Sequence, residues 1–576
     1  MNYRLKLTLL CLPLLCISAC DNMDYNEYNI YNRDYIAEDF INVGGFITRL
    51  YNVVEFDYGN QYGGAMLAST TDEAEYSILG SAIEDFYNGA WSATNAKQTT
   101  WTSMYQGIAA AGEYLTNFTG LTFDELRQNA DYAQQMHRYE NYQYEARFLR
   151  AYFYFLLVRQ YGGVPMPTED MTSEEVNTLP RSSADEVFAY IIAECEAIED
   201  LIIDDYTKLG DYALPTTENG RADRLAVLAL KARAALYWAS PLFNASGEIS
   251  RWTTVVRYYE QLITECEARG KKLCPNYDAL WSTGNYSTSN VTQEIIFARR
   301  YFAGTAGDKL VESYNYPVGI EGGKGGNCPT QNLVDAYPMA NGLDITDPAS
   351  GYDPSNPYQN RDKRLAMTIA VNGDVWPTYT GAQPLETFAG GRNGEPLAGA
   401  TPTGYYLRKL CHGEISLASN PAVASNFHSY VLFRLGGIYL DYAEALYRAS
   451  GDNADVAGSL GLTARQAASL TRGRVSLPDI APDADFWTAY QRERMVELAF
   501  EGHRFWDVRR WKEADRFFVN ITETKISRQI ADDGSVTFTY SPRSVTRQWN
   551  DRQYLFPIPE SERLKNPNLT QNPGWE

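Results

Sequence analysis

Histidine and serine carry much of hydrolytic chemistry, and neither stands here in a catalytic pattern. None of the four histidines has the HExxH spacing of a catalytic zinc site, and the serine-nucleophile pattern GxSxG is absent. The glycine-rich run 321–327 lacks the GxxxxGK[ST] pattern, so we interpret it as a flexible loop and not as a phosphate cradle. The sequence therefore gives no support to a histidine-based metal site or to a serine hydrolase. The histidines are His137, His412, His428 and His503.

Aromatic rings that carry a polar group are the unusual feature of the composition. The chain has 43 Tyr and 11 Trp beside 23 Phe, and such rings suit a wet binding surface better than a dry core. Acidic residues outnumber basic ones 72 to 50, which gives a net charge of -22 and a field that repels nucleic-acid phosphates. Carboxylates are abundant, but a glycosidase pair is defined by its separation in space. We expect a binding protein without a nucleic-acid partner, and a hydrolase is an open alternative.

The N-terminus has the layout of an export signal. Arg4 and Lys6 precede an apolar run over 7–17 that is too short to span a bilayer. Small residues then precede Cys20, and the string Ile-Ser-Ala-Cys at 17–20 resembles a bacterial lipobox. We predict a signal peptide over 1–19, lipid attachment at Cys20 and a lipid-anchored tether over 20–35. Ordinary signal cleavage is the alternative. The five cysteines that follow have no CxxC spacing and predict no disulfide pairing.

Helical periodicity dominates two stretches of the chain, about 36–270 and 427–515. Ser183 with Glu186 forms a candidate capping box, and Gly162-Gly163 ends another helix. Paired helices with Ala and aromatic residues at packing positions resemble degenerate tetratricopeptide units. We predict a mainly α fold built on such a helix-pair scaffold, and an irregular helical bundle is the alternative. The expected helices are 35–51, 139–161, 183–201, 221–239, 251–269, 427–449 and 484–512.

Between about 275 and 425 the sequence changes character. Gly, Asn, Pro and Tyr dominate, and only short candidate strands appear, at Glu294–Ala298 and Tyr405–Leu410. Long loop-rich inserts on a rigid scaffold are where binding surfaces usually lie. We expect the ligand site in this insert and in the early loops.

The string QRERMVELAFEGHRFWDVRRW at 491–511 is the sharpest local feature. Its charged residues interleave at three- and four-residue spacings, which favours ion pairs within one helix. Gly502 would let another helix approach closely. The string is either a functional site or a structural helix whose His503 and arginines are satisfied inside the fold, and we favour the structural interpretation.

This string resembles the ERxxELAFEGxRxxDxRRW signature of the SusD/RagB family of outer-membrane nutrient-binding lipoproteins. The resemblance continues from the lipobox to the last residues, in the order expected for the family. The tail 554–575 matches the family's closing segment nearly letter for letter. The other matching blocks are 145–164, 329–342, 360–365, 403–410 and 439–449.

The resemblance implies a single SusD-like domain over 36–576, with a closing segment at about 550–576. Family members are cell-surface, lipid-anchored proteins of the outer membrane that cover a SusC-like TonB-dependent transporter and hand it glycan or peptide. They are not enzymes, so the resemblance implies no catalytic residue, cofactor or metal. The shared blocks would mostly hold the scaffold together.

The family's ligand site is variable, so the candidate residues come from sugar chemistry, which favours exposed rings beside planar polar groups. The segment 70–101 lies where family members place ligand contacts, and Asp72 and Glu73 match a recurring acidic pair. For each candidate the alternative is ordinary loop packing. The first group of candidates is Asp72, Glu73, Tyr76, Tyr87, Asn88 and Trp91, and the second is Arg300, Tyr301, Tyr314, Tyr316 and Trp376.

We therefore expect a surface lipoprotein that captures an oligo- or polysaccharide and delivers it to a SusC-like transporter. The negative net charge favours a neutral glycan over a polyanionic one. The alternatives are a surface glycoside hydrolase, a peptide-binding member of the same family and a helical-repeat scaffold for other surface lipoproteins.

Overall fold

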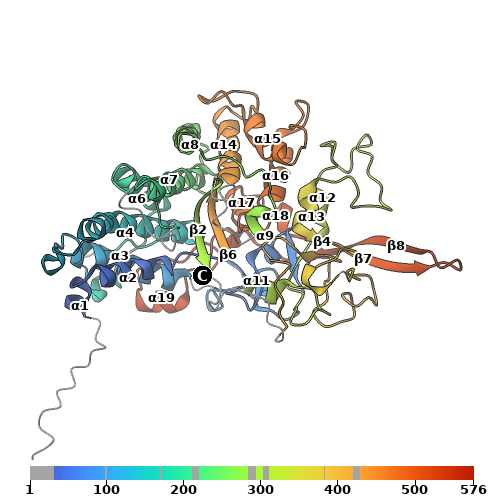
Figure 1. Cartoon of the computed structure of the whole chain (residues 1–576), viewed down its shortest axis with the longest axis horizontal. Coiled ribbons are helices and arrows are strands. Elements are labelled where there is room, and N and C mark those ends of the chain that lie inside the picture. Colours follow the sequence, from blue (N-terminus) through green and yellow to red (C-terminus); the bar gives the residue numbers. More distant parts are fainter. Residues whose placement is uncertain are drawn as a thin grey trace, which may run out of the picture.

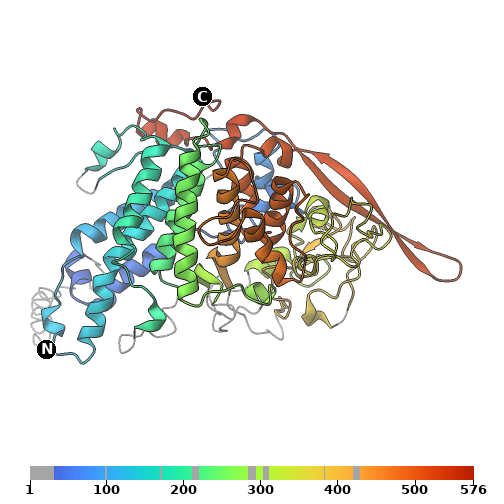
Figure 2. The same cartoon turned by 90° about the horizontal axis from the view of Figure 1, so that it is seen from above.

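The protein has a helical body at one end and a loop-rich end from which a long β-hairpin projects (Figures 1 and 2). This computed structural model describes residues 32–97, 100–168, 171–209, 220–282, 293–301, 310–381, 383–418 and 428–576. The predicted signal peptide, Cys20 and most of the predicted tether lie outside the described residues. The last tether residues are already helical, because α1 (Arg33–Ala37) begins two residues before the expected first helix.

The body is a succession of helices in which each packs on the next: α3 on α4, α4 on α6, and so on through α7, α8, α14 and α15. This arrangement confirms the mainly helical, tetratricopeptide-like scaffold. The main helices are α2 (Phe40–Tyr51), α3 (Thr100–Asn117), α4 (Tyr132–Tyr161), α6 (Ala184–Ile198), α7 (Arg224–Ala239), α8 (Ile249–Ala268), α14 (Leu435–Ala449), α15 (Ala464–Arg474), α16 (Phe486–Glu497) and α17 (Arg504–Arg510).

The local sequence explains why these helices begin and pack where they do. Ser183 caps α6 and forms the predicted capping box with Glu186, which satisfies two backbone N–H groups. In α7 nearly every side chain is buried, because small alanines let neighbouring helices approach from several sides. The capping and packing patterns are local, which is why the sequence predicts these helices well.

Three predicted helices are wrong in part. The helix expected over 35–51 is interrupted between α1 and α2, where Asp39 caps the start of α2. Residues His428–Arg434 form a strand, β6, because their β-branched and aromatic side chains pair with β2 (Ile295–Tyr301). The predicted helix 484–512 breaks between α16 and α17, where Phe500 and Gly502 both have positive φ. A Cβ at Gly502 would lie 2.6 Å from Tyr430 Oη, so this glycine admits a tyrosine of β6 and not another helix.

The strands form two-stranded antiparallel pairs within the described residues. β1 (Ala74–Tyr76) pairs with β3 (Asn327–Pro329), which joins the early loops to the insert. β7 (Asn520–Ile530) and β8 (Val536–Thr546) form the projecting hairpin of Figures 1 and 2. The remaining elements are β4 (Ile369–Ala370), β5 (Tyr406–Leu407), α5 (Ser173–Val176), α9 (Ala279–Ser282), α11 (Leu310–Asn315), α12 (Gln331–Ala336), α13 (Lys363–Thr368), α18 (Ala514–Phe518) and α19 (Glu560–Lys565).

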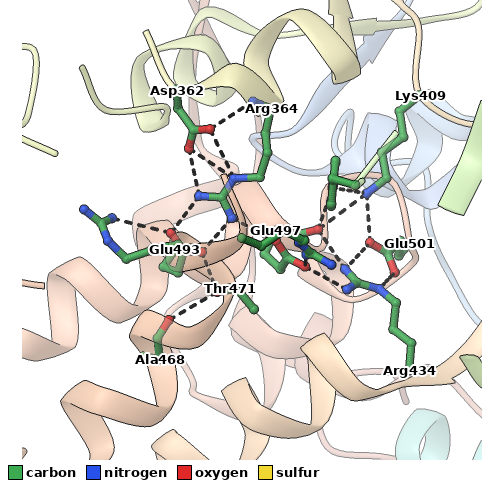
Figure 3. A network of polar contacts seen from close by, with 12 residues as sticks. Asp362, Arg364, Lys409, Arg434, Ala468, Thr471, Glu493, Glu497 and Glu501 are labelled. Atoms are coloured by element: carbon green, nitrogen blue, oxygen red, sulfur yellow. Dashed lines mark hydrogen bonds and ion pairs between the residues drawn. The ribbon is translucent and has the colours of Figure 1, made fainter. Parts of the chain in front are cut away.

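A buried ion-pair network joins the segments of the motif blocks (Figure 3). Arg364 of α13 donates to Asp362, to Glu493 and to Glu497, with N···O distances of 2.6–2.8 Å. Arg434 continues the chain by donating to Glu497 and Glu501, each at 2.7 Å. Lys409 donates to Glu501 at 2.8 Å, and burial lowers the pKa of this lysine to about 8.

The network shows how the charged residues of the string 491–511 are paired. Its acids and arginines pair mostly with other elements and not along one helix, so the expectation of intrahelical ion pairs is wrong in the main. Asp507 with Arg510, at 2.9 Å, is an intrahelical pair within α17. The Glu497 carbonyl accepts from Tyr277 Oη and Arg434 Nη2 at 2.7 and 2.9 Å, and these side-chain donors help to end α16 there. The structural interpretation of the string is the one that these contacts support.

Candidate functional site

The early loop 59–65 lies between two groups of predicted ligand contacts. Tyr62 Oη donates to the Lys97 carbonyl at 2.7 Å, and Tyr76 Oη donates to the Gly63 carbonyl at 2.9 Å. Gly64 has a φ of 114°, and a Cβ there would lie 2.3 Å from Tyr76 Oη and 2.6 Å from Tyr314 Cδ1. Only glycine fits at this position, and its absence of a side chain brings the two tyrosines together.

The insert reaches the same place from α11 and the glycine-rich loop. Tyr314 is half-buried, and Nζ of the exposed Lys324 lies 4.9 Å from the centre of its ring. The Ser77 N–H donates to the Gly326 carbonyl at 2.9 Å, which places the following residues beside this loop. Those residues, Ile78 and Leu79, are 39% and 90% exposed. Residues 321–326 form a loop, as predicted, while Asn327 begins β3, and the loop forms one side of a surface.

We call this region the loop surface and define it as Gly63, residues 77–80, Tyr314 and Lys324. It combines a half-exposed tyrosine ring, exposed aliphatic side chains and a lysine. Rings and aliphatic groups match the C–H faces of sugars, while an ammonium group donates hydrogen bonds to hydroxyls. In Figure 1 the blue early loops lie beside α11, in agreement with these contacts.

The predicted acidic pair does not face this surface. Both carboxylate oxygens of Asp72 accept from Arg504, at 2.8 and 2.7 Å, in the interior. Glu73 accepts from the Phe500 N–H at 3.3 Å, and burial raises the pKa of its carboxyl to about 8. The pair joins the early segment to the chain around α17, so the expectation that it contacts ligand is wrong for this structure. The reason is Arg504, which belongs to the string 491–511 and pairs with Asp72 inside the fold.

Trp91 is also an internal residue, only 1% exposed. Its ring packs on Phe556, Phe86 and Trp575, with centroid distances of 4.6, 4.7 and 5.0 Å. The expectation that Trp91 presents its face to a ligand therefore does not hold. The ring instead anchors the loop that carries Tyr87 and Asn88 to the closing segment of the chain.

Tyr87 and Asn88 do reach the surface on that loop. Asn88 is exposed, and its Oδ1 accepts from the Ala90 N–H at 2.9 Å. Tyr87 is half-buried, with the Arg547 guanidinium 4.5 Å from its ring centre. Burial alone would raise the pKa of the neighbouring Asp85, but hydrogen bonds from Lys97, Asn95 and Asn88 hold it below its usual range. The loop is therefore a rigid polar edge beside the loop surface.

The second predicted group is divided by the fold. Tyr316 is fully buried, with its Oη 2.6 Å from the His412 carbonyl, and Trp376 packs edge-on against it at 6.1 Å. Both rings are core residues, so the expectation of ligand contact is wrong for them. Arg300 is half-buried, and its aliphatic stem lies 3.0 Å from the position of a Cβ on Gly220. The side chain of Tyr301 lies outside the described residues.

Of the eleven predicted contacts, Tyr314 belongs to the loop surface. The buried Tyr76 packs beneath the loop surface, and Tyr87 and Asn88 lie next to it. Sequence reasoning missed Ile78, Leu79 and Lys324. The glycines at 63–64 and 325–326 were the available signal, because such runs mark close approach of two backbones.

The structure gives three further findings, on metal sites, on membrane-crossing helices and on the cysteines. Within the described ranges, no cluster of three or more His, Cys, Asp or Glu side chains has the geometry of a metal site. Among the helices in the described part of the chain, none has both the length and the apolar character that crossing a membrane requires. The five described cysteines are buried and free: Cys195, Cys266, Cys274, Cys328 and Cys411.

Two family models match this chain over most of its length. The model described as "SusD family" matches residues 293–575, and the model described as "Starch-binding associating with outer membrane" matches residues 25–236. The chain therefore belongs to the SusD family. Among its relatives, SusD-like protein P2 of Formosa agariphila is 24% identical over 490 residues, which are 82% of this chain and 80% of that protein.

Solved structures share the fold. A SusD-like protein of Bacteroides fragilis matches with a TM-score of 0.72 at 23% identity, covering 94% of this chain and 98% of the other. A SusD-like carbohydrate-binding protein of the same organism matches with a TM-score of 0.70 at 21% identity, covering 93% and 100%. A laminarin-binding SusD-like protein matches with a TM-score of 0.60 at 20% identity, covering 93% and 99%.

Proposed function

We propose that this protein is a cell-surface lipoprotein, anchored through Cys20, that captures a neutral oligo- or polysaccharide and delivers it to a SusC-like TonB-dependent transporter. Family membership supports the class, and a glycan ligand is supported by the laminarin-binding protein of the same fold and by the family model described as starch-binding. The observation that carries the proposal is the loop surface, where Tyr314, Lys324 and exposed aliphatic groups converge from distant segments.

The loop surface suits weak binding of single sugar units. Its ring and aliphatic groups contact sugar faces, and its lysine binds hydroxyls, so the affinity per sugar unit is modest and repeated units add avidity. A glycosidase needs two carboxyl groups about 5–10 Å apart at the scissile bond. Glu84 beside the surface already accepts from the Gly80 N–H at 2.7 Å, and Glu321 lies in the adjacent loop. Family membership is what favours a binding protein over the glycosidase alternative.

Affinity electrophoresis of the mature protein, from Asp21 onward, tests the proposal. The panel holds neutral and acidic polysaccharides, and Tyr314→Ala is run beside wild type. We expect retardation by at least one neutral glycan and weaker retardation of the variant by the same glycan. Release of reducing sugars by pure protein would instead support a hydrolase. No retardation by any glycan would overturn glycan capture and favour peptide capture.

A further inference from the structure

A groove of about 880 Å³ runs along α3 and shares no lining residue with the loop surface. One wall is the face of α3 that carries Thr102, Gln106, Ala109 and Glu113, which helical spacing places in one row. The opposite wall comes from α5 and α19. The volume lies within the range of pockets that enclose small ligands, about 300–1,000 Å³.

The half-buried rings of Tyr105 and Pro167 form an apolar part of the groove, and the buried Trp101 packs behind Tyr105. Trp101 and Tyr105 lie with ring centres 5.1 Å apart, and Trp101 is held from behind by Tyr161 at 5.0 Å. Tyr105 Oη donates to the Pro165 carbonyl at 2.8 Å, which fixes the tyrosine ring. These flat groups are pre-organised, so a ligand does not have to order them on binding.

The charged side chains that line the groove already form ion pairs. Arg33 pairs with Glu113 at 2.9 Å, and Lys565 pairs with Glu562 at 2.8 Å. Arg150 pairs with Glu194, which lies outside the groove, at 3.4 Å. Among the described lining residues, each charged side chain thus has an opposite partner. The polar groups left to face a ligand include the exposed amides of Gln106 and Asn177 and the hydroxyls of Thr102 and Thr116.

We propose that this groove is a second carbohydrate site, specific for a neutral oligosaccharide. Matched charges give no preference for a charged ligand, while rigid rings and exposed amides suit the faces and hydroxyls of uncharged sugars. The inference rests on the proposed function and extends it from one site to two. Two sites on one molecule hold a long glycan more tightly than either alone, because the second binds at high effective concentration.

Filling the groove tests the inference. Ala109 is an exposed helical residue of the wall, so Ala109→Trp occludes the groove without disturbing the core. The matched control is Ala197→Trp, at an exposed position of α6 outside the groove. Calorimetric titration with an oligosaccharide of the glycan that wild type binds should give two sites for wild type and for the control. Ala109→Trp and Tyr314→Ala should each retain one, and the double variant none.

The outcomes separate this inference from the proposed function. Binding by wild type that Tyr314→Ala abolishes, with unchanged stoichiometry in Ala109→Trp, overturns the second site alone. Absence of glycan binding by wild type overturns both proposals. Loss of binding to a proline-containing peptide in Ala109→Trp, with glycan stoichiometry unchanged, overturns the carbohydrate assignment and makes the groove a peptide site.

Discussion

The buried ion-pair network and the loop surface are both rich in polar side chains, but they satisfy them differently. In the network Arg364 and Glu497 are fully buried, and each pairs with several other charged side chains. On the loop surface Lys324 is exposed and Tyr314 half-buried, held by loops that meet through backbone contacts. The charged residues of a sequence motif can therefore be paired inside the fold, while the proposed binding surface carries no sequence motif.

The comparison predicts its largest effect at Arg364. Arg364→Met leaves Asp362, Glu493 and Glu497 as buried carboxylates without this partner, and breaking such a pair costs about 3–5 kcal/mol. Urea denaturation should show this loss. Lys324→Met, an exposed lysine of the loop surface, is the control and should stay within about 0.5 kcal/mol of wild type. Equal effects of the two substitutions would remove the distinction between the regions.

Substitutions of Trp91 test whether this buried ring contributes to stability or to ligand binding. Trp91→Ala should destabilise the protein by about 3–5 kcal/mol, because it opens a cavity between Phe86, Phe556 and Trp575. Trp91→Phe keeps an aromatic ring there, so we expect a smaller loss of stability and glycan affinity within about twofold of wild type. The account is contradicted if Trp91→Phe loses glycan binding while its denaturation midpoint is unchanged, since that would make the indole a ligand contact.

Substitution of Tyr314 should affect glycan binding more than stability, which is the reverse of the expectation for Trp91. Removing its half-exposed ring should weaken glycan binding by about tenfold or more, about 1.4 kcal/mol, while the stability loss stays below that of Trp91→Ala. Calorimetric titration and urea denaturation of the same preparation measure both quantities. Tyr316→Phe, a conservative change of a buried neighbour, is the matched control for binding. Unchanged affinity in Tyr314→Ala would place the ligand elsewhere.

Glu73 should make the stability of the protein depend on pH. Burial raises the pKa of this carboxyl from 4.5 to about 8, so between those pH values the folded protein holds a proton that the unfolded chain releases. Its contribution to stability is present below pH 4.5 and is lost as the pH rises through 8. Glu73→Gln removes this titrating carboxyl. The difference between the melting temperatures of the variant and of wild type should therefore shift in favour of the variant as the pH rises from 5 to 9. A constant difference over that range would contradict the buried, protonated carboxyl.

The sequence predicts the scaffold far better than the site, for a physical reason. The capping box of Ser183 and the end of α4 at Gly162 depend on residues a few positions apart. The burial of Trp91 depends on Trp575, and that of Asp72 on Arg504, partners more than 400 positions away. The hairpin β7–β8 was overlooked, although an Asp-Gly pair flanked by alternating strand residues is a known turn signal.

Hydrogen exchange with and without bound glycan tests the central claim most directly, because it reports protection along the whole chain. The account predicts that glycan protects the segments that carry the loop surface, at 59–65, 77–80 and 310–326. It also predicts protection of the exposed face of α3. The string 491–511 should exchange slowly and equally in both states, because its polar groups are already paired inside the fold. Glycan-dependent protection confined to 491–511, with the loop surface unchanged, would contradict the account and make the motif the site.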